Sequence, residues 1–311
     1  MTESDFFREK LPRCSGDFAF LIGNGINRYF QQALSWSALL SRTINRNHLN
    51  FPDSVREILK EGKSKSCLSF PEIASLIEEM RKAEGGSGEW LKKEIASCFR
   101  EKVSRCALLD YAQRTQKDII TTNYDFTIED SLGISRSPKP AKAPIGRRSL
   151  YHYLFEYFEK ENSARVWHIH GHCGRIKSIR ITLEDYINAL NYIKNHLFSK
   201  DGNYCPPWEG SGWPGGSGCL GPFFTKPLVI VGCGLQSEEV LLRGLLLRKL
   251  HGDIRSKGRK SPIKNGGFYL SGESGENNDK KAFFEAVGIE FVSFRDYADL
   301  YDNPAWTELK R

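Results

Sequence analysis

Two short apolar segments, each ending in Gly-x-Gly, constrain the fold of this chain more than any other feature. Phe18–Gly25 reads Phe-Ala-Phe-Leu-Ile-Gly-Asn-Gly, and Pro227–Gly234 reads Pro-Leu-Val-Ile-Val-Gly-Cys-Gly. Short runs rich in aromatic and β-branched residues are typical of buried parallel strands. A glycine pair after such a strand permits a tight turn and a close approach of the backbone to a phosphate. One such turn is a weak signal, because the third glycine of a dinucleotide fingerprint is missing, but two in one chain predict a nucleotide held from both sides of a sheet crevice.

After the first glycine turn the chain reads as helical over a long stretch. A cap at Asn27 would begin a helix whose N–H groups point at the same phosphate. Apolar residues then recur at spacings of three and four from Phe51 to Gln113. We therefore expect a helical insertion over about residues 37–115, between the first and second parts of the sheet.

The remainder of the chain alternates between strand and helix patterns. We expect strands at 119–122, 166–172, 227–231, 267–270 and 289–294, and helices from 127, at 150–160, from 182, at 238–250 and at 280–287. The Gly-, Pro- and Trp-rich stretch at about 200–224 reads as an irregular loop, in which Trp208 and Trp213 either contact a ligand or partner or pin the loop to the body. The pattern predicts an α/β fold, with a Rossmann-like parallel sheet and a helical insertion subdomain, in a single domain over residues 1–311.

Composition favours a cytoplasmic protein. Hydrophobic residues make up 40% of the chain, which is ordinary for a globular protein, yet no apolar run approaches the roughly 20 residues that span a bilayer. The N-terminus is polar and acidic and carries no signal-peptide pattern. The eight cysteines include no Cys-x-x-Cys pair, so we expect reduced thiols and no bound metal.

Basic residues cluster at Arg136–Arg148 and at Arg248–Lys264. Both stretches contain Pro, Gly and Ser, as solvated loops do. The net charge of +7 is modest for 311 residues, and no nucleic-acid recognition motif accompanies the clusters. We therefore expect no nucleic-acid partner, and the role of the two basic stretches stays open.

The stretch Asp118–Asp125 reads Asp-Ile-Ile-Thr-Thr-Asn-Tyr-Asp and is the next most informative. A strand here would deliver Asn123 and Asp125 at its carboxyl end, where the ligand crevice of an open α/β sheet lies. An Asn there can orient a sugar hydroxyl or a water, because its amide both donates and accepts. Alternatively, both side chains only tie down the turn and cap the following helix.

Three histidines occur at alternate positions in Val166–His172. Alternation along a strand would place His168, His170 and His172 on one face. Residues i and i+4 of a strand are about 13 Å apart, so one strand could not bring all three onto one metal ion. We favour a single working histidine, His170, which a neighbouring glycine leaves accessible and which acts as a neutral general base near physiological pH.

In order and spacing, five motifs resemble the Sir2-like family, the sirtuin fold, across roughly residues 15–300. They are Gly23–Asn27, Thr121–Asp125, His168–Gly171, Ile181–Tyr186 and Val231–Gly234. The closest resemblance is to the bacterial anti-phage defence branch of NAD-hydrolysing proteins. It implies a Sir2/DHS-like NAD-binding fold in which Asn123 positions a water or the nicotinamide ribose and His170 is the general base at the ribose hydroxyls.

The resemblance also implies which residues bind NAD+. The phosphate and ribose loop corresponds to Gly23, Asn24, Gly25 and Asn27, the adenosine side to Gly232 and Gly234, and the turn that carries the catalytic Asn adds Thr122 and Asp125.

Two departures from the family pattern matter. The four-cysteine zinc module of deacylating sirtuins is absent, and with it an element that helps to form their acyl-peptide cleft. The first motif is Gly-Asn-Gly-Ile-Asn in place of the usual version with alanine and serine. In the last motif the chain runs into Gln-Ser-Glu-Glu where the family often has an Asp, so Glu238 or Glu239 takes that role.

The activity that the resemblance implies is cleavage of the nicotinamide–ribose bond of NAD+, giving nicotinamide and ADP-ribose or a cyclised product. Because unregulated cleavage would be toxic, we expect a homo-oligomer or a partner, such as an ATPase or a phage component, to gate the activity in abortive infection. Two other functions stay open: a non-catalytic module that senses NAD or ADP-ribose, and an NAD-dependent protein deacylase, against which the missing zinc cysteines argue.

Overall fold

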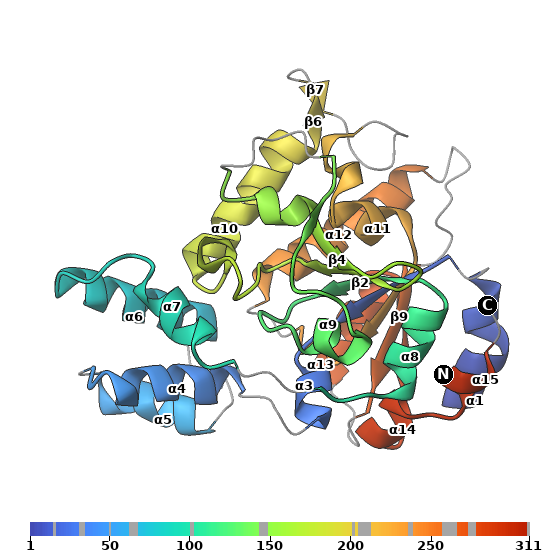
Figure 1. Cartoon of the computed structure of the whole chain (residues 1–311), viewed down its shortest axis with the longest axis horizontal. Helices are drawn as coiled ribbons and strands as arrows, with labels where there is room; N and C mark the ends of the chain where they lie inside the picture. Colours follow the sequence, from blue (N-terminus) through green and yellow to red (C-terminus); the bar gives the residue numbers. More distant parts are fainter. Residues whose placement is uncertain are drawn as a thin grey trace.

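An eight-stranded sheet forms the centre of the molecule (Figure 1). The computed structural model describes residues 1–14, 17–30, 35–49, 51–61, 68–99, 103–142, 149–200, 203–204, 213–235, 239–256, 266–272 and 278–309. In spatial order the strands are β10 (Ile289–Ser293), β9 (Gly267–Ser271), β8 (Leu228–Val231), β1 (Ala19–Ile22), β2 (Asp118–Thr121), β5 (Arg165–His168), β4 (Glu156–Glu159) and β3 (Lys139–Pro140).

The six strands from β10 to β5 are parallel, and β4 and β3 extend the sheet in antiparallel fashion. Counted along the chain, the parallel strands follow the order 3-2-1-4-5-6 of a doubly wound nucleotide-binding sheet. The strand order reverses between β1 and β8, which pair directly from Ala19 opposite Leu228 to Ile22 opposite Val231. The predicted α/β fold with a Rossmann-like parallel sheet is confirmed.

Both faces of the sheet are buried, as in other parallel sheets. Along β1, Ala19 and Leu21 belong to one apolar cluster, whereas Phe20 and Ile22 belong to another on the opposite face. The first face is covered by α10 (Leu183–Tyr192), α11 (Leu220–Thr225), α12 (Val240–Ser256) and α13 (Asn278–Ala286). The second is covered by α8 (Ala107–Arg114), α9 (Thr127–Leu132), α14 (Tyr297–Tyr301), α15 (Ala305–Glu308) and an N-terminal segment that includes α1 (Glu3–Asp5) and α2 (Leu11–Arg13).

Four helices form a lobe beside the sheet, at the left of Figure 1. They are α4 (Trp36–Arg46), α5 (Asp53–Glu61), α6 (Phe70–Ala83) and α7 (Trp90–Ala96), and they share a core of their own. A buried ion pair joins the lobe to the body, because Lys92 Nζ lies 2.7 Å from Asp185 Oδ1, which is also 3.2 Å from the Arg180 guanidinium. Asp185 in turn completes the capping box of α10 with Thr182.

Two predicted elements are wrong. Residues 150–160 form no long helix but a 3₁₀ turn, His152–Phe155, followed by β4. Alternating burial along Glu156–Glu159 and pairing with β5 override the local helical pattern. In addition, β5 ends at His168, so the three histidines do not continue one strand.

Part of the predicted irregular loop at 200–224 is ordered structure. A 3₁₀ turn covers Pro214–Ser217, and α11 begins at Leu220. Trp213 is buried against Phe198 and Phe224, so it pins this segment to the body. Trp208 and the residues around it lie outside the described residues, as do most of the basic stretch after Lys142 and the residues from 257 to 265.

The two glycine turns touch each other where the strand order reverses. Gly25 donates its backbone N–H to the Gly232 carbonyl oxygen at 2.9 Å. A Cβ on Gly25 would lie 2.5 Å from the Gly232 Cα, and a Cβ on Gly232 would lie 2.4 Å from the Tyr301 hydroxyl. Gly232 also has a φ of +64°, which disfavours any side chain. Only glycine therefore fits this crossing.

We expect Gly232→Ala to lower the free energy of unfolding by at least ~2 kcal/mol, because it adds both a clash and an unfavourable φ. The matched control is Gly234→Ala, where a Cβ would meet no atom within 4 Å. That substitution should change stability by about 0.5 kcal/mol or less. Urea unfolding of both variants tests the account, which is wrong if they are equally stable.

Candidate active site

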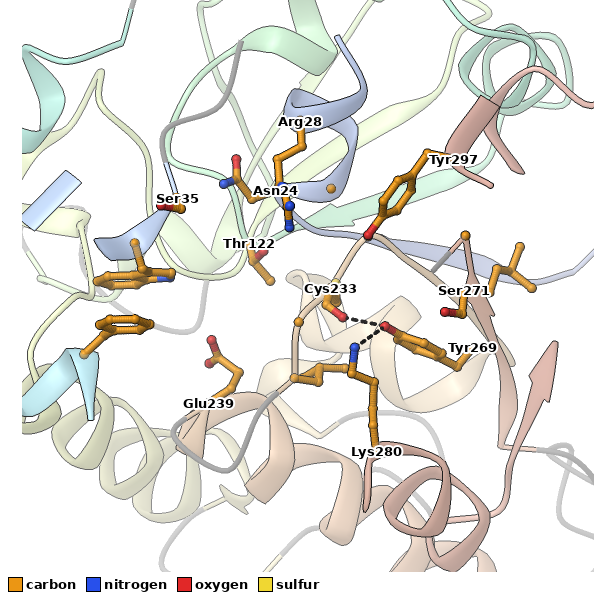
Figure 2. A pocket seen from close by; sticks show the side chains of 18 of the residues that line it. Asn24, Arg28, Ser35, Thr122, Cys233, Glu239, Tyr269, Ser271, Lys280 and Tyr297 are labelled. Carbon is orange, nitrogen blue, oxygen red and sulfur yellow. Dashed lines mark hydrogen bonds between the residues drawn. The ribbon is translucent and has the colours of Figure 1, made fainter. Parts of the chain in front are cut away.

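A cavity of about 240 Å³ opens at the carboxyl ends of the central strands, where the strand order reverses (Figure 2). Both glycine turns line it, with Gly25 on the β1 side and Gly232 and Gly234 on the β8 side. In open α/β sheets this crevice is the usual position of a bound ligand.

Charged and polar side chains face this cavity from several elements. Figure 2 shows Arg28, from α3 (Gly25–Tyr29), and Lys280, from α13, pointing into it from opposite sides, with Glu239 at another edge. The Tyr269 hydroxyl donates to the Cys233 carbonyl oxygen at 2.9 Å and accepts from Lys280 Nζ at 3.2 Å. Two cations beside glycine turns suit a ligand that carries phosphate groups.

The helical lobe supplies an aromatic wall. Trp36 of α4 and Phe70 of α6 line the cavity with their rings nearly parallel, at an interplanar angle of 3° and a centroid separation of 6.5 Å. Ser35 holds the start of α4 by accepting the Ala38 N–H at 3.1 Å. The cavity is thus enclosed between the lobe and the sheet.

A smaller chamber of about 70 Å³ adjoins the first cavity and shares five lining residues with it, namely Asn24, Trp36, Thr122, Tyr186 and Glu239. Its remaining lining consists of Leu39, Phe99, Asn123, Tyr124, Asp125 and His170. The structure therefore brings Asn123 and His170 together in one chamber.

Asn123 is buried with one polar atom left over. Its backbone N–H donates to Thr121 Oγ1 at 3.1 Å, and its Nδ2 donates to the Gly23 carbonyl oxygen at 3.4 Å. Its Oδ1 is buried and has no hydrogen-bond partner among the described residues. Because a buried acceptor without a partner is costly, this oxygen is suited to a hydroxyl or a water that arrives with a ligand.

Asp125, in contrast, has both carboxylate oxygens engaged. Oδ1 accepts the Thr127 N–H at 2.9 Å, at the start of α9, and Oδ2 accepts from Asn27 Nδ2 at 2.7 Å. Asn27 lies inside α3 and does not cap it, so the expected cap at Asn27 is wrong. Asp125 and Asn27 thus join the Thr122–Asp125 turn to the first glycine turn.

His170 is 1% exposed and packs against the Tyr186 ring. Its Nε2 lies 3.3 Å from Glu239 Oε1, although neither ring nitrogen forms a hydrogen bond with a described residue. Burial lowers the pKa of His170 to about 3. The Glu239 carboxylate opposes this shift, since it favours an imidazolium at that distance. In the absence of ligand His170 is therefore neutral and able to accept a proton.

The other two histidines lie away from His170. The rings of His168 and His172 are 5.4 Å apart and both pack against Phe126 and Phe158. Burial lowers the pKa of His172 despite the nearby Glu156. Because β5 ends at His168 and the chain then turns, with a φ of +78° at Gly171, the three side chains do not share one face, contrary to the expected alternation.

The glycine at position 171 is required for packing, and not, as expected, for access to His170. A Cβ there would lie 2.1 Å from the Ser178 carbonyl oxygen, so this glycine permits packing against Ser178. The accessibility of His170 comes instead from the chamber.

The predicted NAD-binding residues divide into two groups. Asn24, Gly25, Thr122, Gly232 and Gly234 line the larger cavity, and Asp125 lines the chamber. Gly23 and Asn27 line neither space. They instead form hydrogen bonds with Asn123 and Asp125 of the turn after β2. Sequence reasoning missed Arg28, Trp36, Phe70 and Lys280. Arg28 directly follows the predicted loop Gly23–Asn27, and the other three lie in helices whose sequences carry no ligand-binding motif. Glu239 was one of two proposed carboxylates, and the other, Glu238, lies outside the described residues.

Within the described part of the chain, no three His, Cys, Asp or Glu side chains are grouped so as to hold a metal ion. No helix there is both long and apolar enough to cross a bilayer.

The fold is that of the doubly wound α/β class, whose members commonly bind a nucleotide in this crevice. A family model for the SIR2-like domain matches residues 117–292, more than half of the chain, and the protein belongs to this family. Sir2-like proteins are generally NAD-consuming enzymes, so an NAD-related activity follows. The match runs from β2 to β10, and the structure places β1 and its glycine turn in the middle of that matched sheet. No curated protein matches the chain.

We expect the His170 ring to stay neutral from pH 8 down to pH 5, because its pKa is lowered to about 3 by burial. NMR titration of 15N-labelled histidine tests this. A midpoint for His170 near 6.5 would contradict this expectation, since it would mean that hydration or Glu239 offsets the effect of burial.

Proposed function

We propose that this protein is an NAD+ glycohydrolase that cleaves the nicotinamide–ribose bond to give nicotinamide and ADP-ribose. One observation carries the proposal: Asn123 Oδ1 and both His170 ring nitrogens are buried in the chamber without hydrogen-bond partners among the described residues. Two polar groups left in this state are expected where a ligand supplies the missing partners.

The two spaces fit the two parts of NAD+. The larger cavity offers glycine turns and the cations Arg28 and Lys280 for the pyrophosphate and adenosine. The chamber, with its aromatic walls, would take the nicotinamide ribose. NAD+ is the substrate in this scheme, and we propose no metal cofactor.

The reaction needs orientation more than acid catalysis. The C1′–N bond breaks with its electron pair going to the nicotinamide nitrogen, which becomes neutral, and the ribose acquires oxocarbenium character. Water then adds to C1′ and releases one proton. Asn123 Oδ1 would orient a ribose hydroxyl or the water, and neutral His170 would accept the proton.

Glu239 can stabilise the protonated form of His170, which burial disfavours. A neutral imidazole with a pKa near 3 accepts protons poorly. The carboxylate at 3.3 Å would stabilise the imidazolium as it forms, which raises the basicity of His170 during the reaction. Glu239 also lies in the stretch after Val231–Gly234 where the family often has an Asp.

The biological setting is a further part of the proposal. The resemblance to anti-phage NAD hydrolases supports an NAD-depleting effector in abortive infection, gated by homo-oligomerisation, by a partner ATPase or by a phage component. Whether ring closure competes with hydrolysis depends on water access to the chamber.

We expect Asn123→Ala and His170→Ala each to lower turnover of NAD+ at least ~100-fold, the scale of losing a general base or its positioning partner. Chromatography of nicotinamide and ADP-ribose measures this, in the presence of candidate activators if the isolated protein is inactive.

Asn303→Ala is the matched control, since Asn303 is an equally buried asparagine far from both cavities, beside Glu3. Near-native turnover in Asn123→Ala would contradict the proposal. Binding of NAD+ without cleavage would favour the sensor function, and release of acetyl-ADP-ribose from an acyl peptide would favour the deacylase.

A further inference from the structure

A buried ion pair lies directly behind Asn123. His168, at the end of β5, and Glu129, in α9, are 1% and 0% exposed. His168 Nε2 is 2.7 Å from Glu129 Oε1, and its Nδ1 is 2.7 Å from the backbone carbonyl oxygen of Asn123. Neither residue lines the cavity or the chamber.

The two partners of His168 determine its protonation. A carbonyl oxygen and a carboxylate can only accept, so the ring makes both hydrogen bonds when both of its nitrogens carry a proton. Burial by itself would lower the pKa of His168, but Glu129 and the Asn123 carbonyl oxygen outweigh it and raise that pKa above its ordinary value. Asp125 favours the same charged form, and the neighbouring His172 is held neutral by burial.

The pair completes a set of contacts that hold Asn123. Its backbone N–H donates to Thr121, its carbonyl oxygen accepts from His168, and its Nδ2 donates to Gly23. Together these contacts leave Oδ1 as the one polar atom of Asn123, a chamber residue, without a partner among the described residues. The orientation of Oδ1 therefore depends on His168.

We propose that His168 and Glu129 are positioning residues: His168 fixes the Asn123 backbone through Nδ1, and Glu129 fixes the His168 ring. This inference rests on the proposed function, because it assigns the pair to the orientation of Asn123 during NAD+ cleavage.

A purely structural role explains the pair less well. Replacing a buried ion pair by apolar side chains is often neutral or stabilising, so such a pair is weak support for the stability of a core. The surroundings here are already apolar, since Phe126 and Phe158 pack on the His168 ring. A charged pair at this position is better explained by the hydrogen bond that it gives to Asn123.

Two substitutions of His168 separate positioning from stability. The amide of Asn can replace Nδ1, so His168→Asn keeps the donor to Asn123 but leaves Glu129 without its partner. The amide of Gln can replace Nε2, so His168→Gln keeps a partner for Glu129 but withdraws the donor from Asn123.

We expect His168→Gln to lower kcat about 100-fold, the scale of misplacing a catalytic group by ~1 Å, with an unchanged dissociation constant for NAD+. His168→Asn should retain most of the activity and lose stability, because it leaves a buried carboxylate unpaired. In an Asn123→Ala background, His168→Gln should cost no further activity, since it acts through Asn123. Equal losses of activity in the two variants, or additive losses with Asn123→Ala, would overturn the inference.

NMR tests whether His168 holds the Asn123 backbone even if the wild-type protein cleaves no NAD+. Absence of cleavage would count against the proposed function alone. Both ring nitrogens of His168 should be protonated at pH 7, and the 13C shift of the Asn123 carbonyl should change in His168→Gln. If Asn or Gln at 168 prevents folding, Glu129→Gln should still convert the His168 ring to its neutral form. A neutral ring in the wild type, or an unchanged Asn123 carbonyl, would overturn the inference.

Discussion

The contact between the two glycine turns is the constraint on which the rest of the site depends. Gly25 donates to the Gly232 carbonyl oxygen at 2.9 Å, and no side chain fits between the two backbones. This contact exists because β1 and β8 are direct neighbours, although more than 200 residues separate them in the chain. It brings the carboxyl ends of both strands to one crevice. The segments that follow the two strands then place Asn24, Arg28 and Glu239 in the lining of the cavity.

Around this contact, the molecule combines a rigid sheet edge with a separate helical lobe. The sheet supplies Asn123 and His170, whereas the lobe supplies Trp36 and closes the chamber around them. The buried contact of Lys92 with Asp185 holds the lobe against the body. Because one wall of the chamber belongs to the lobe, a partner or a second subunit that moved the lobe would change access to Asn123 and His170. This arrangement is compatible with an enzyme whose activity is gated.

The sequence predicted the parallel sheet, both glycine turns and the positions of Asn123, Asp125 and His170 in the crevice, because each depends on a local pattern: an apolar run, a Gly-x-Gly or a polar residue after a strand. It failed where tertiary pairing decides the structure. Residues 156–159 form a strand because β5 offers an open edge, and the His170 side chain leaves the face of His168 because β5 ends at His168 and the chain turns there. Lys280 and Phe70 could not be identified as cavity residues, since only the packing of distant helices brings them there.

The most direct test of the account is a crystal structure of the Asn123→Ala protein with NAD+ bound. We expect the pyrophosphate beside Gly25 and Gly232 and the nicotinamide ribose in the chamber, with C1′ facing His170 and the space vacated by the Asn123 side chain. NAD+ bound in the opposite direction, with adenine in the chamber, or bound outside the crevice, would contradict it.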